Sequence, residues 1–357
     1  MSTALQPLLE EVISQIAAPA DVYEAQARTH LDALTKPLGS LGRLEDMAAQ
    51  WFAIRCGMVT GPVSKAVYVF AADHGITAEG VSAYPSEVTR QMVLNFLSGG
   101  AAINVLARLN HVDVNVVDVG VDGDLAGHAG LAQYKVRRGS RNMLREAAMS
   151  EEELAAAISV GLTLAEAAFA KGNNLLAVGE MGIGNTTAAS VMTAALTGTP
   201  ASLVTGRGTG LDSAAYDHKC RIVDAVVRRH FAQPKGAREI LRCAGGLEIA
   251  AMTGMMLGAA RRQIAIVIDG FISTAAAAIA CGLAPAVRSY LFAGHRSQEP
   301  GHRVLLAYLD IEPILDLDMR LGEGSGAVLA MPVLEGALRL YREMATFASA
   351  GVSEANA

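Results

Sequence analysis

Residues 174–187, NLLAVGEMGIGNTT, join a short apolar run to a glycine-rich turn that leads into a segment of helical pattern. The apolar part, residues 174–178, has the length of a buried strand. Further apolar runs of strand length precede polar or glycine-containing turns, and they span residues 65–72, 112–119, 263–268 and 289–293. Continuous apolar strands that alternate with helical segments are typical of a parallel sheet covered on both faces. We therefore expect an α/β fold with a Rossmann-like parallel sheet.

The predicted strands all fall within residues 61–330, which we assign to one large α/β domain. Residues 1–60 and 331–357 show helical patterns without a convincing strand, so we expect the two chain ends to pack together as a small helical domain. The chain of 357 residues is 52% hydrophobic and 18% charged. This composition supplies a large core and excludes disorder as the main state.

Charge and hydropathy narrow the class of protein. A net charge of −6 argues against a nucleic-acid partner, which requires a basic surface. The uncharged runs 181–206 and 270–287 are long enough to cross a bilayer, but both consist largely of small residues and contain a proline, so we interpret them as buried helices and expect no membrane partner. The four cysteines form no CxxC pair and the first residues lack a signal-peptide pattern, so we expect a cytoplasmic protein.

Two glycine-rich turns are candidates for binding phosphate. Residues 179–187 and 205–210 each precede a predicted helix, whose N-terminal N–H groups favour an anion by roughly 0.3–1 kcal/mol. Lys219 lies on the helix that Asp212 is expected to cap, within reach of such a phosphate. Neither turn matches a P-loop or a dinucleotide fingerprint. A tight turn followed by a solvated helix charge explains the same residues equally well.

Other titratable side chains lie in polar loops. His74 follows Asp73 at a predicted strand end, and we favour a structural role for it because no second histidine stands at ligand spacing. His295 and His302 lack a third nearby ligand, so we expect no metal. Glu323 stands between two glycines in MRLGEGSGA, where a carboxylate is accessible to substrate and suits a general base. An acidic residue in the first turn of a helix explains Glu323 equally well.

Six segments in fixed order together resemble the nicotinate-nucleotide:dimethylbenzimidazole phosphoribosyltransferase family. They are KPLGSLGRLE (36–45), DHGITAEGVSAYP (73–85), GEMGIGNTT (179–187), TGRGTGLD (205–212), GHRSQEPGH (294–302) and MRLGEGSGA (319–327). The resemblance covers residues 28–332. It implies a homodimeric glycosyltransferase of cobalamin biosynthesis that moves the phosphoribosyl group of nicotinate mononucleotide onto 5,6-dimethylbenzimidazole. The substrates are small molecules, and no cofactor is implied.

The resemblance also implies the roles of individual residues. Glu323 matches the family's general base, and Glu180 is the candidate for stabilising an oxocarbenium-like transition state. Inversion at C1′ from β to α would give α-ribazole 5′-phosphate and nicotinate. Phosphate and ribose contacts are expected from Gly182, Asn185, Thr186, Gly208 and Lys219. The base pocket is expected to include Ser82, Tyr84, Gln91, Met181 and Leu321.

Two other functions stay open at the level of the sequence. A nucleotide-dependent dehydrogenase would use the turn at 179–187, although no acidic residue ends a strand about 20 positions further on. A non-catalytic module that binds a nucleotide or a corrinoid would use the same turns without turnover. The identity of the preferred base is also open.

Overall fold

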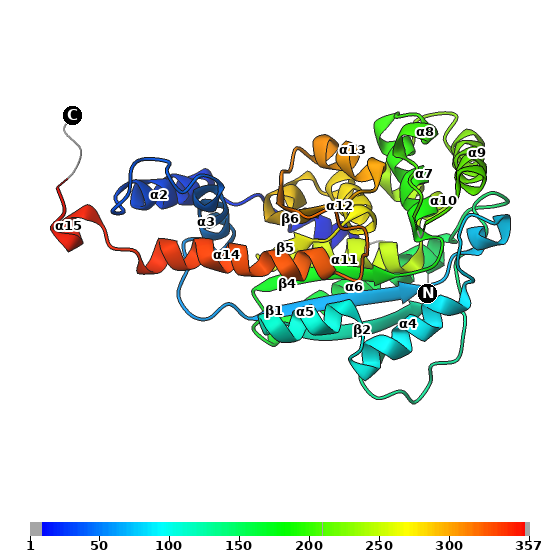
Figure 1. The fold of residues 1–357 in the computed structure, drawn as a ribbon, viewed down its shortest axis with the longest axis horizontal. Helices are drawn as coiled ribbons and strands as arrows, with labels where there is room; N and C mark the ends of the chain where they lie inside the picture. Colours follow the sequence, from blue (N-terminus) through cyan, green and yellow to red (C-terminus); the bar gives the residue numbers. More distant parts are fainter. Residues whose placement is uncertain (1–8, 209, 354–357) are drawn as a thin grey trace.

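The computed structural model describes residues 9–208 and 210–353 and shows one seven-stranded sheet (Figure 1). The strands are β1 (Lys65–Ala72), β2 (Asp113–Gly120), β3 (Leu131–Gln133), β4 (Leu175–Met181), β5 (Ala265–Ile268), β6 (Leu291–Arg296) and β7 (Pro313–Asp316). Their order is β3-β2-β1-β4-β5-β6-β7, and every neighbouring pair is parallel. The predicted α/β class is therefore confirmed. The chain moves in opposite directions along the sheet from β1 and from β4, which makes the gap between them the switch point where such folds bind ligands.

All five predicted strands are present, and four of them have shifted ends. β1 has the predicted bounds, because each of its residues after Lys65 is buried between two neighbouring strands. β4 extends three residues beyond the predicted end, since its pairing with β1 continues to Ala71 and Met181. Glu180 and Met181 therefore belong to the strand and not to the turn that follows it.

The sequence did not predict the two edge strands. β3 has three residues and β7 has four, and β7 begins with a proline. Neither has an apolar run of normal strand length, and a proline at the first position is typical of an edge strand. Each strand pairs with a single neighbour, so the sheet and not the local sequence decides its conformation.

Helices cover both faces of the sheet (Figure 1). The longer ones are α2 (Asp21–Asp32), α3 (Arg43–Ile54), α4 (Glu87–Ser98), α5 (Ala102–Asn110), α6 (Glu151–Ala170), α7 (Asn185–Thr197), α9 (Ser213–His230), α10 (Ala237–Ala244), α11 (Leu247–Arg261), α12 (Phe271–Leu283), α13 (Pro300–Leu309) and α14 (Ser325–Glu343). The shorter ones are η1 (Gly75–Glu79), α8 (Ala201–Val204), η2 (Pro285–Tyr290) and α15 (Phe347–Ala350). α5 and α14 pack together on one face, and α6, α11 and α12 pack on the other.

Helices α2 and α3 lie side by side with the C-terminal part of α14 at one end of the molecule (Figure 1). The N-terminal end of the described chain lies elsewhere, since Leu9 lines a small cavity with Leu154 and Ile158 of α6. α3 packs on α2 and on the C-terminal part of α14. The backbone N–H of Thr35 donates to Ala345 at 2.9 Å, and that of Phe347 donates to Ala33 at 3.0 Å. α14 continues without a break through residue 330, where the sequence predicts a domain boundary. The division into two domains stays a prediction, and residues 1–8 and 354–357 of the predicted small domain lie outside the described residues.

Two apolar segments of the described chain, Glu87–Asn110 and Glu151–Ala170, have the length and hydropathy of a membrane span. The first consists of two helices, α4 and α5, and the second is α6, which packs along α11. The two runs that the sequence analysis interpreted as buried helices contain α7 and α12, whose residues are largely buried.

Gly161 on α6 and Gly254 on α11 allow the two helices to lie in close contact. A methyl group on Gly161 or on Gly254 would clash with the backbone of the opposite helix. We expect Gly161→Ala to lower the free energy of unfolding by about 1–3 kcal/mol through overpacking. Gly336→Ala in α14 is the control, since open space surrounds that position, and it should raise stability by roughly 0.5–1 kcal/mol. Urea unfolding measures both, and equal effects would contradict the close contact.

Candidate active site

A cavity of about 450 Å³ opens at the carboxyl ends of β4, β5 and β6. Parallel sheets bind ligands at this edge because the loops and helix N-termini converge there. Every predicted site residue except Gln91 and Lys219 lines it: Ser82, Tyr84, Glu180, Met181, Gly182, Asn185, Thr186, Gly208, Leu321 and Glu323. Segments from four regions of the sequence therefore meet in one cavity.

Glu323 has an unusual backbone conformation that fixes its position. Its φ is 63°, and the flanking Gly322 and Gly324 have φ values of 88° and 85°. A non-glycine residue in this left-handed region is strained and requires support from its surroundings. The support comes from Asp269, whose Oδ2 accepts the N–H of Gly324 at 3.1 Å. Strand β4 passes so close that a side chain at Gly179 would clash with the Glu323 carbonyl.

The Glu323 carboxyl group is buried at the start of α5. Its Oε2 accepts the backbone N–H of Ile103 at 3.1 Å, and the residue is 5% exposed. Burial raises the pKa of Glu323, the Ile103 N–H opposes this rise, and the negative charge of Asp269 adds to it. A carboxyl group whose pKa lies closer to neutrality than usual is suited to general acid–base chemistry.

Glu180 projects from β4 into the same cavity. The amide of Asn185 donates a hydrogen bond to its Oε2, and its Oε1 lies directly against Gly322. Burial raises the pKa of Glu180 well above its ordinary value, and the nearby charges of Asp269 and Glu248 raise it further. The site therefore favours the protonated form of this carboxyl group.

The two glycine-rich turns meet near Lys219. Its ammonium group donates to Thr186 Oγ1 at 2.9 Å and to the Gly206 carbonyl at 3.2 Å. Lys219 is buried and stands behind the cavity wall formed by Thr186 and Gly208. Burial lowers the pKa of Lys219 to about 8, although the charge of Glu299 opposes this effect. In this position, the ammonium group of Lys219 can attract an anion that binds between the two turns.

Gln91 does not line the cavity. Val88 and Met92 of the same helix, α4, do line it. These two residues are four positions apart and share one helix face, whereas Gln91 lies about 100° around the helix from Met92. Gln91 is exposed instead.

Several residues that line the cavity or support it have no predicted site role. Asp269 and His295 follow or end β5 and β6, so their place at strand ends was the available signal. Asp269 accepts the N–H groups of Gly326 and Ala327 at 2.7 and 3.0 Å and therefore caps α14. His295 is buried in the cavity wall, with Nε2 3.6 Å from Asp269 Oδ1, and neither of its ring nitrogens makes a hydrogen bond within the described part of the chain.

Two further charged residues that line the cavity, Glu299 and Arg320, form hydrogen bonds with Gly208. Glu299 Oε1 accepts the N–H of Gly208 at 3.0 Å, and the Arg320 guanidinium donates to the Gly208 carbonyl at 2.9 Å. The turn at 205–210 is thereby tied to the loops that follow β6 and β7. The local sequence gives no signal for either contact, because the partners are about 90 and 112 residues apart.

His295 and His302 do not form a metal site. The His302 ring accepts the N–H of Ser297 at Nδ1 and contacts the Thr274 hydroxyl at Nε2. Burial lowers the pKa of His302 to about 3, so the ring is neutral. Within residues 9–208 and 210–353, no group of three His, Cys, Asp or Glu side chains is arranged to hold a metal ion.

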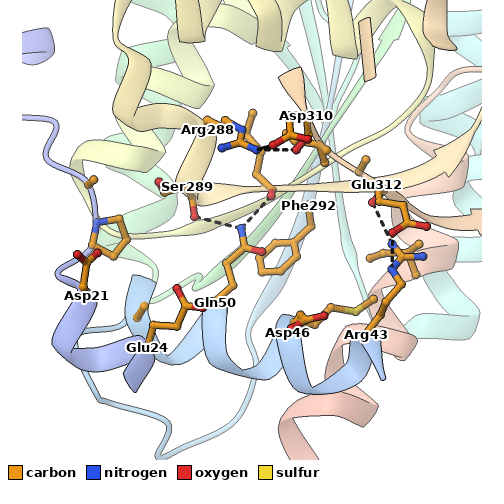
Figure 2. Close-up of a pocket in the computed structure, with 18 of the residues that line it drawn as sticks. Asp21, Glu24, Arg43, Asp46, Gln50, Arg288, Ser289, Phe292, Asp310 and Glu312 are labelled. Carbon is orange, nitrogen blue, oxygen red and sulfur yellow. Dashed lines mark hydrogen bonds and ion pairs between the residues drawn. The ribbon is translucent and has the colours of Figure 1, made fainter. Parts of the chain in front are cut away.

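A second cavity of about 470 Å³ lies between helices α2 and α3 and the beginning of β6 (Figure 2). Its charged side chains pair with each other: Arg288 contacts Asp310 at 2.5 Å, and Arg43 contacts Glu312 at 3.4 Å. Gln50 donates to backbone carbonyls of η2 and β6. This cavity does not lie at the carboxyl ends of the strands, and we assign no chemistry to it.

A parallel sheet, a cavity at the carboxyl ends of β4, β5 and β6, two glycine-rich turns and two buried carboxyl groups are the features of an α/β enzyme that acts on a nucleotide. A family model described as phosphoribosyltransferase matches residues 16–352. Nicotinate-nucleotide–dimethylbenzimidazole phosphoribosyltransferases from Chloroflexus aurantiacus and Geobacter sulfurreducens are 51% and 50% identical to this chain, over 97% of it and 99% of each relative. The chain belongs to this phosphoribosyltransferase family.

Solved structures agree with this assignment. The crystal structure of the enzyme of that name from Thermus thermophilus is 48% identical to this chain and superposes with a TM-score of 0.88. The match covers 93% of this chain and 99% of that one. A second structure from the same organism gives a TM-score of 0.89 at 49% identity.

The buried environment of Glu180 predicts that a neutral side chain at this position stabilises the fold at neutral pH. A raised native pKa means that the protonated carboxyl group stabilises the fold fully below about pH 4 and that this stabilisation is lost as the pH rises through the native pKa. Glutamine imitates the protonated form, so Glu180→Gln should raise the free energy of unfolding at pH 8 by roughly 0.5–2 kcal/mol. The gain should shrink toward pH 4.

Urea unfolding across this pH range measures the effect. The control is Glu312→Gln, whose side chain is 69% exposed and which should change stability by no more than about 0.5 kcal/mol. A Glu180→Gln protein that is less stable than the wild type at pH 8 would show that the native site favours the ionised carboxylate.

Proposed function

We propose that this protein transfers the 5-phosphoribosyl group of nicotinate mononucleotide to 5,6-dimethylbenzimidazole. The products are α-ribazole 5′-phosphate and nicotinate, and the reaction belongs to cobalamin biosynthesis. Relatives that bear this activity in their name match nearly the whole chain, which supports the substrate assignment. The observation on which the chemistry rests is the Glu323 carboxyl group, which is held in a left-handed turn within a cavity of nucleotide size.

The reaction needs a base more than it needs an acid. A nitrogen of the benzimidazole attacks C1′, and the C1′–N bond to nicotinate breaks with its electron pair passing to the pyridine nitrogen. That nitrogen is cationic in the donor and neutral in the product, so it leaves without a proton. The other benzimidazole nitrogen loses its N–H proton, and a basic side chain accelerates this transfer.

Glu323 is the general base in this proposal. Its Oε2 accepts the backbone N–H of Ile103 and is held by it. We assign Oε1 to the substrate proton. The raised pKa supports this role because a base works best when its pKa approaches the working pH.

Glu180 stabilises positive charge in this proposal. The ribosyl ring becomes oxocarbenium-like as the bond to nicotinate breaks, and a nearby carboxylate lowers the energy of that cation. The cationic donor also lowers the pKa of an adjacent carboxyl group, so donor binding favours the ionised form of Glu180. Attack from the face opposite to nicotinate inverts C1′ from β to α.

The remaining cavity residues bind the two substrates. Gly182, Asn185, Thr186 and Gly208 contact the phosphate and ribose, and Lys219 supplies the positive charge behind them. The benzimidazole occupies the part of the cavity that is lined by Ser82, Tyr84, Met181 and Leu321, together with Val88 and Met92 of α4. The apolar members of this group suit a flat aromatic ring.

We also propose that the enzyme is a homodimer that works in the cytoplasm without nucleic-acid or membrane partners. Tyr84 and Leu321 at the cavity are 54% and 55% exposed, and large exposed apolar side chains beside a site are typical of a surface that a partner covers. All four cysteines are free, as is usual for a protein of a reducing compartment.

The first test is an assay with Glu323→Gln. We expect the wild type, with nicotinate mononucleotide and 5,6-dimethylbenzimidazole and without added metal, to release nicotinate and α-ribazole 5′-phosphate in equal amounts on chromatography. Turnover should fall by about 10²–10⁴-fold in the variant, with the affinity for the donor nearly unchanged, because only the proton transfer is lost. Glu312→Gln is the matched control.

Unchanged turnover in Glu323→Gln would remove this residue from the mechanism. Failure of the wild type with this base would call for a panel of other benzimidazoles, purines and phenols. If every base failed while the nucleotide still bound, the protein would be a binding module and not an enzyme.

The lowered pKa of Lys219 predicts that donor binding depends on pH. The ammonium form is lost as the pH rises through about 8, so the KM for the donor should increase between pH 7 and pH 9. Lys219→Met should weaken donor binding by roughly tenfold or more at pH 7 and remove this part of the pH dependence. Lys235→Met, an exposed lysine, is the control. A wild-type profile that stays flat over this range would contradict the assignment of Lys219 to the phosphate.

A further inference from the structure

Three buried polar residues lie directly beneath the turn at residues 182–184, outside the cavity wall. They are His74 after β1, Thr89 on α4 and Glu248 on α11. We propose that these three are positioning residues, which hold the turn in the conformation that binds the phosphoribosyl group of the donor. This inference rests on the proposed function, in which Gly182 and its neighbours contact the donor.

The first support is an ion pair between His74 and Glu248. Their side chains are about 1% and 0% exposed, and His74 Nε2 lies 2.6 Å from Glu248 Oε1. Burial lowers the pKa of His74, but the charge and hydrogen bond of Glu248, together with the charge of Asp73, more than offset this effect, so the pKa of His74 is raised and the charged form of the ring is favoured. A short hydrogen bond between charged partners fixes the orientation of the imidazole ring.

The fixed ring fills the space under the glycines of the turn. A side chain at Gly182 would clash with the Ala72 carbonyl and meet the His74 ring at 3.3 Å. One at Gly184 would meet Thr77 at 2.9 Å and Cβ of His74 at 3.1 Å. Gly246, just before α11, lies so close to the ring that any side chain there would clash with it. A ring packed between two backbone segments leaves neither of them room to shift.

The second support is a hydrogen bond to the middle of the turn. The N–H of Ile183 donates to Thr89 Oγ1 at 3.1 Å, and Thr89 is fully buried. Ile183 itself lines the cavity, so this bond connects α4 to the wall that faces the donor. The turn is thereby held from α4 as well as from the His74–Glu248 pair.

Supports of this kind act on binding rather than on chemistry. Glu323, the base, stands on a different loop and contacts none of the three residues through a hydrogen bond. A displaced turn should therefore raise the KM for the donor more than it lowers kcat. A purely structural role would lower the stability without changing the KM.

Thr89→Val is the sharpest test because valine keeps the shape and removes the acceptor. We expect the KM for nicotinate mononucleotide to rise by roughly tenfold or more, with kcat and the KM for the benzimidazole within about threefold of the wild type. Thr89→Ser should restore the donor KM. The control is Thr193→Val, since Thr193 is equally buried and bonds only within its own helix, α7.

His74→Gln and Glu248→Gln test the ion pair. Each should raise the donor KM, and the double variant should cost no more than either single change, because both remove the same support. Additive losses would mean that the two residues act separately. A donor KM that stays within twofold of the wild type in all three of Thr89→Val, His74→Gln and Glu248→Gln would overturn the proposal.

A ligand-free measurement separates this inference from the proposed function. Amide hydrogen exchange in peptides that contain residues 181–187 should be at least about tenfold faster in Thr89→Val and His74→Gln than in the wild type, and unchanged in Thr193→Val. Equal exchange in all four proteins would also overturn the proposal. Absence of turnover in the wild type, with the exchange difference present, would instead count against the proposed function.

Discussion

The carboxylate of Asp269 is the contact on which the site depends. It lies at the end of β5 and accepts three backbone N–H groups, those of Gly324, Gly326 and Ala327, so it joins the sheet to the start of α14. The same contact fixes the left-handed turn that presents Glu323, and it places a negative charge beside His295. A buried carboxylate is tolerated there because helix N-terminal N–H groups compensate its charge. Without this contact, the strained backbone of Glu323 would relax and the carboxyl group would move.

The charges around the cavity explain how an acidic protein binds an anionic nucleotide. Glu180, Asp269 and Glu323 are buried close together. The charge of Asp269 raises the pKa of both glutamates, and that of Glu323 raises the pKa of Glu180, so the site resists full ionisation. A donor with a cationic pyridinium ring relieves this repulsion. In the proposed function, the phosphate lies against two glycine-rich turns, behind which stands the buried Lys219. The net charge of −6 is therefore compatible with phosphate binding, because the attraction is local.

Much of the fold could be predicted from local sequence, for identifiable physical reasons. Residues 65–72 form a strand with the predicted bounds because a central parallel strand is apolar along its whole length. Ser150 and Glu153 form a capping box at the start of α6, and the spacing of these two residues is a local property of the sequence. The edge strands β3 and β7 could not be predicted, since they have three and four residues and exist only through pairing with a neighbour. Glu180 belongs to β4 and not to the turn for the same reason, because its pairing with Phe70 extends the strand.

The sequence by itself determined the fold class, the family resemblance and most of the residues that meet in the cavity, because apolar periodicity and ordered motifs are local properties of the chain. The tertiary structure decided which side chains turn toward the cavity. Val88 and Met92 face it and Gln91 does not, since the rotation of α4 about its axis is set by packing. Three contacts of the site exist only in the folded chain. Ile103 and Glu323 are 220 residues apart, His74 and Glu248 are 174 apart, and Thr89 and Ile183 are 94 apart. Contacts over such separations leave no local pattern, because burial and charge compensation in three dimensions select them.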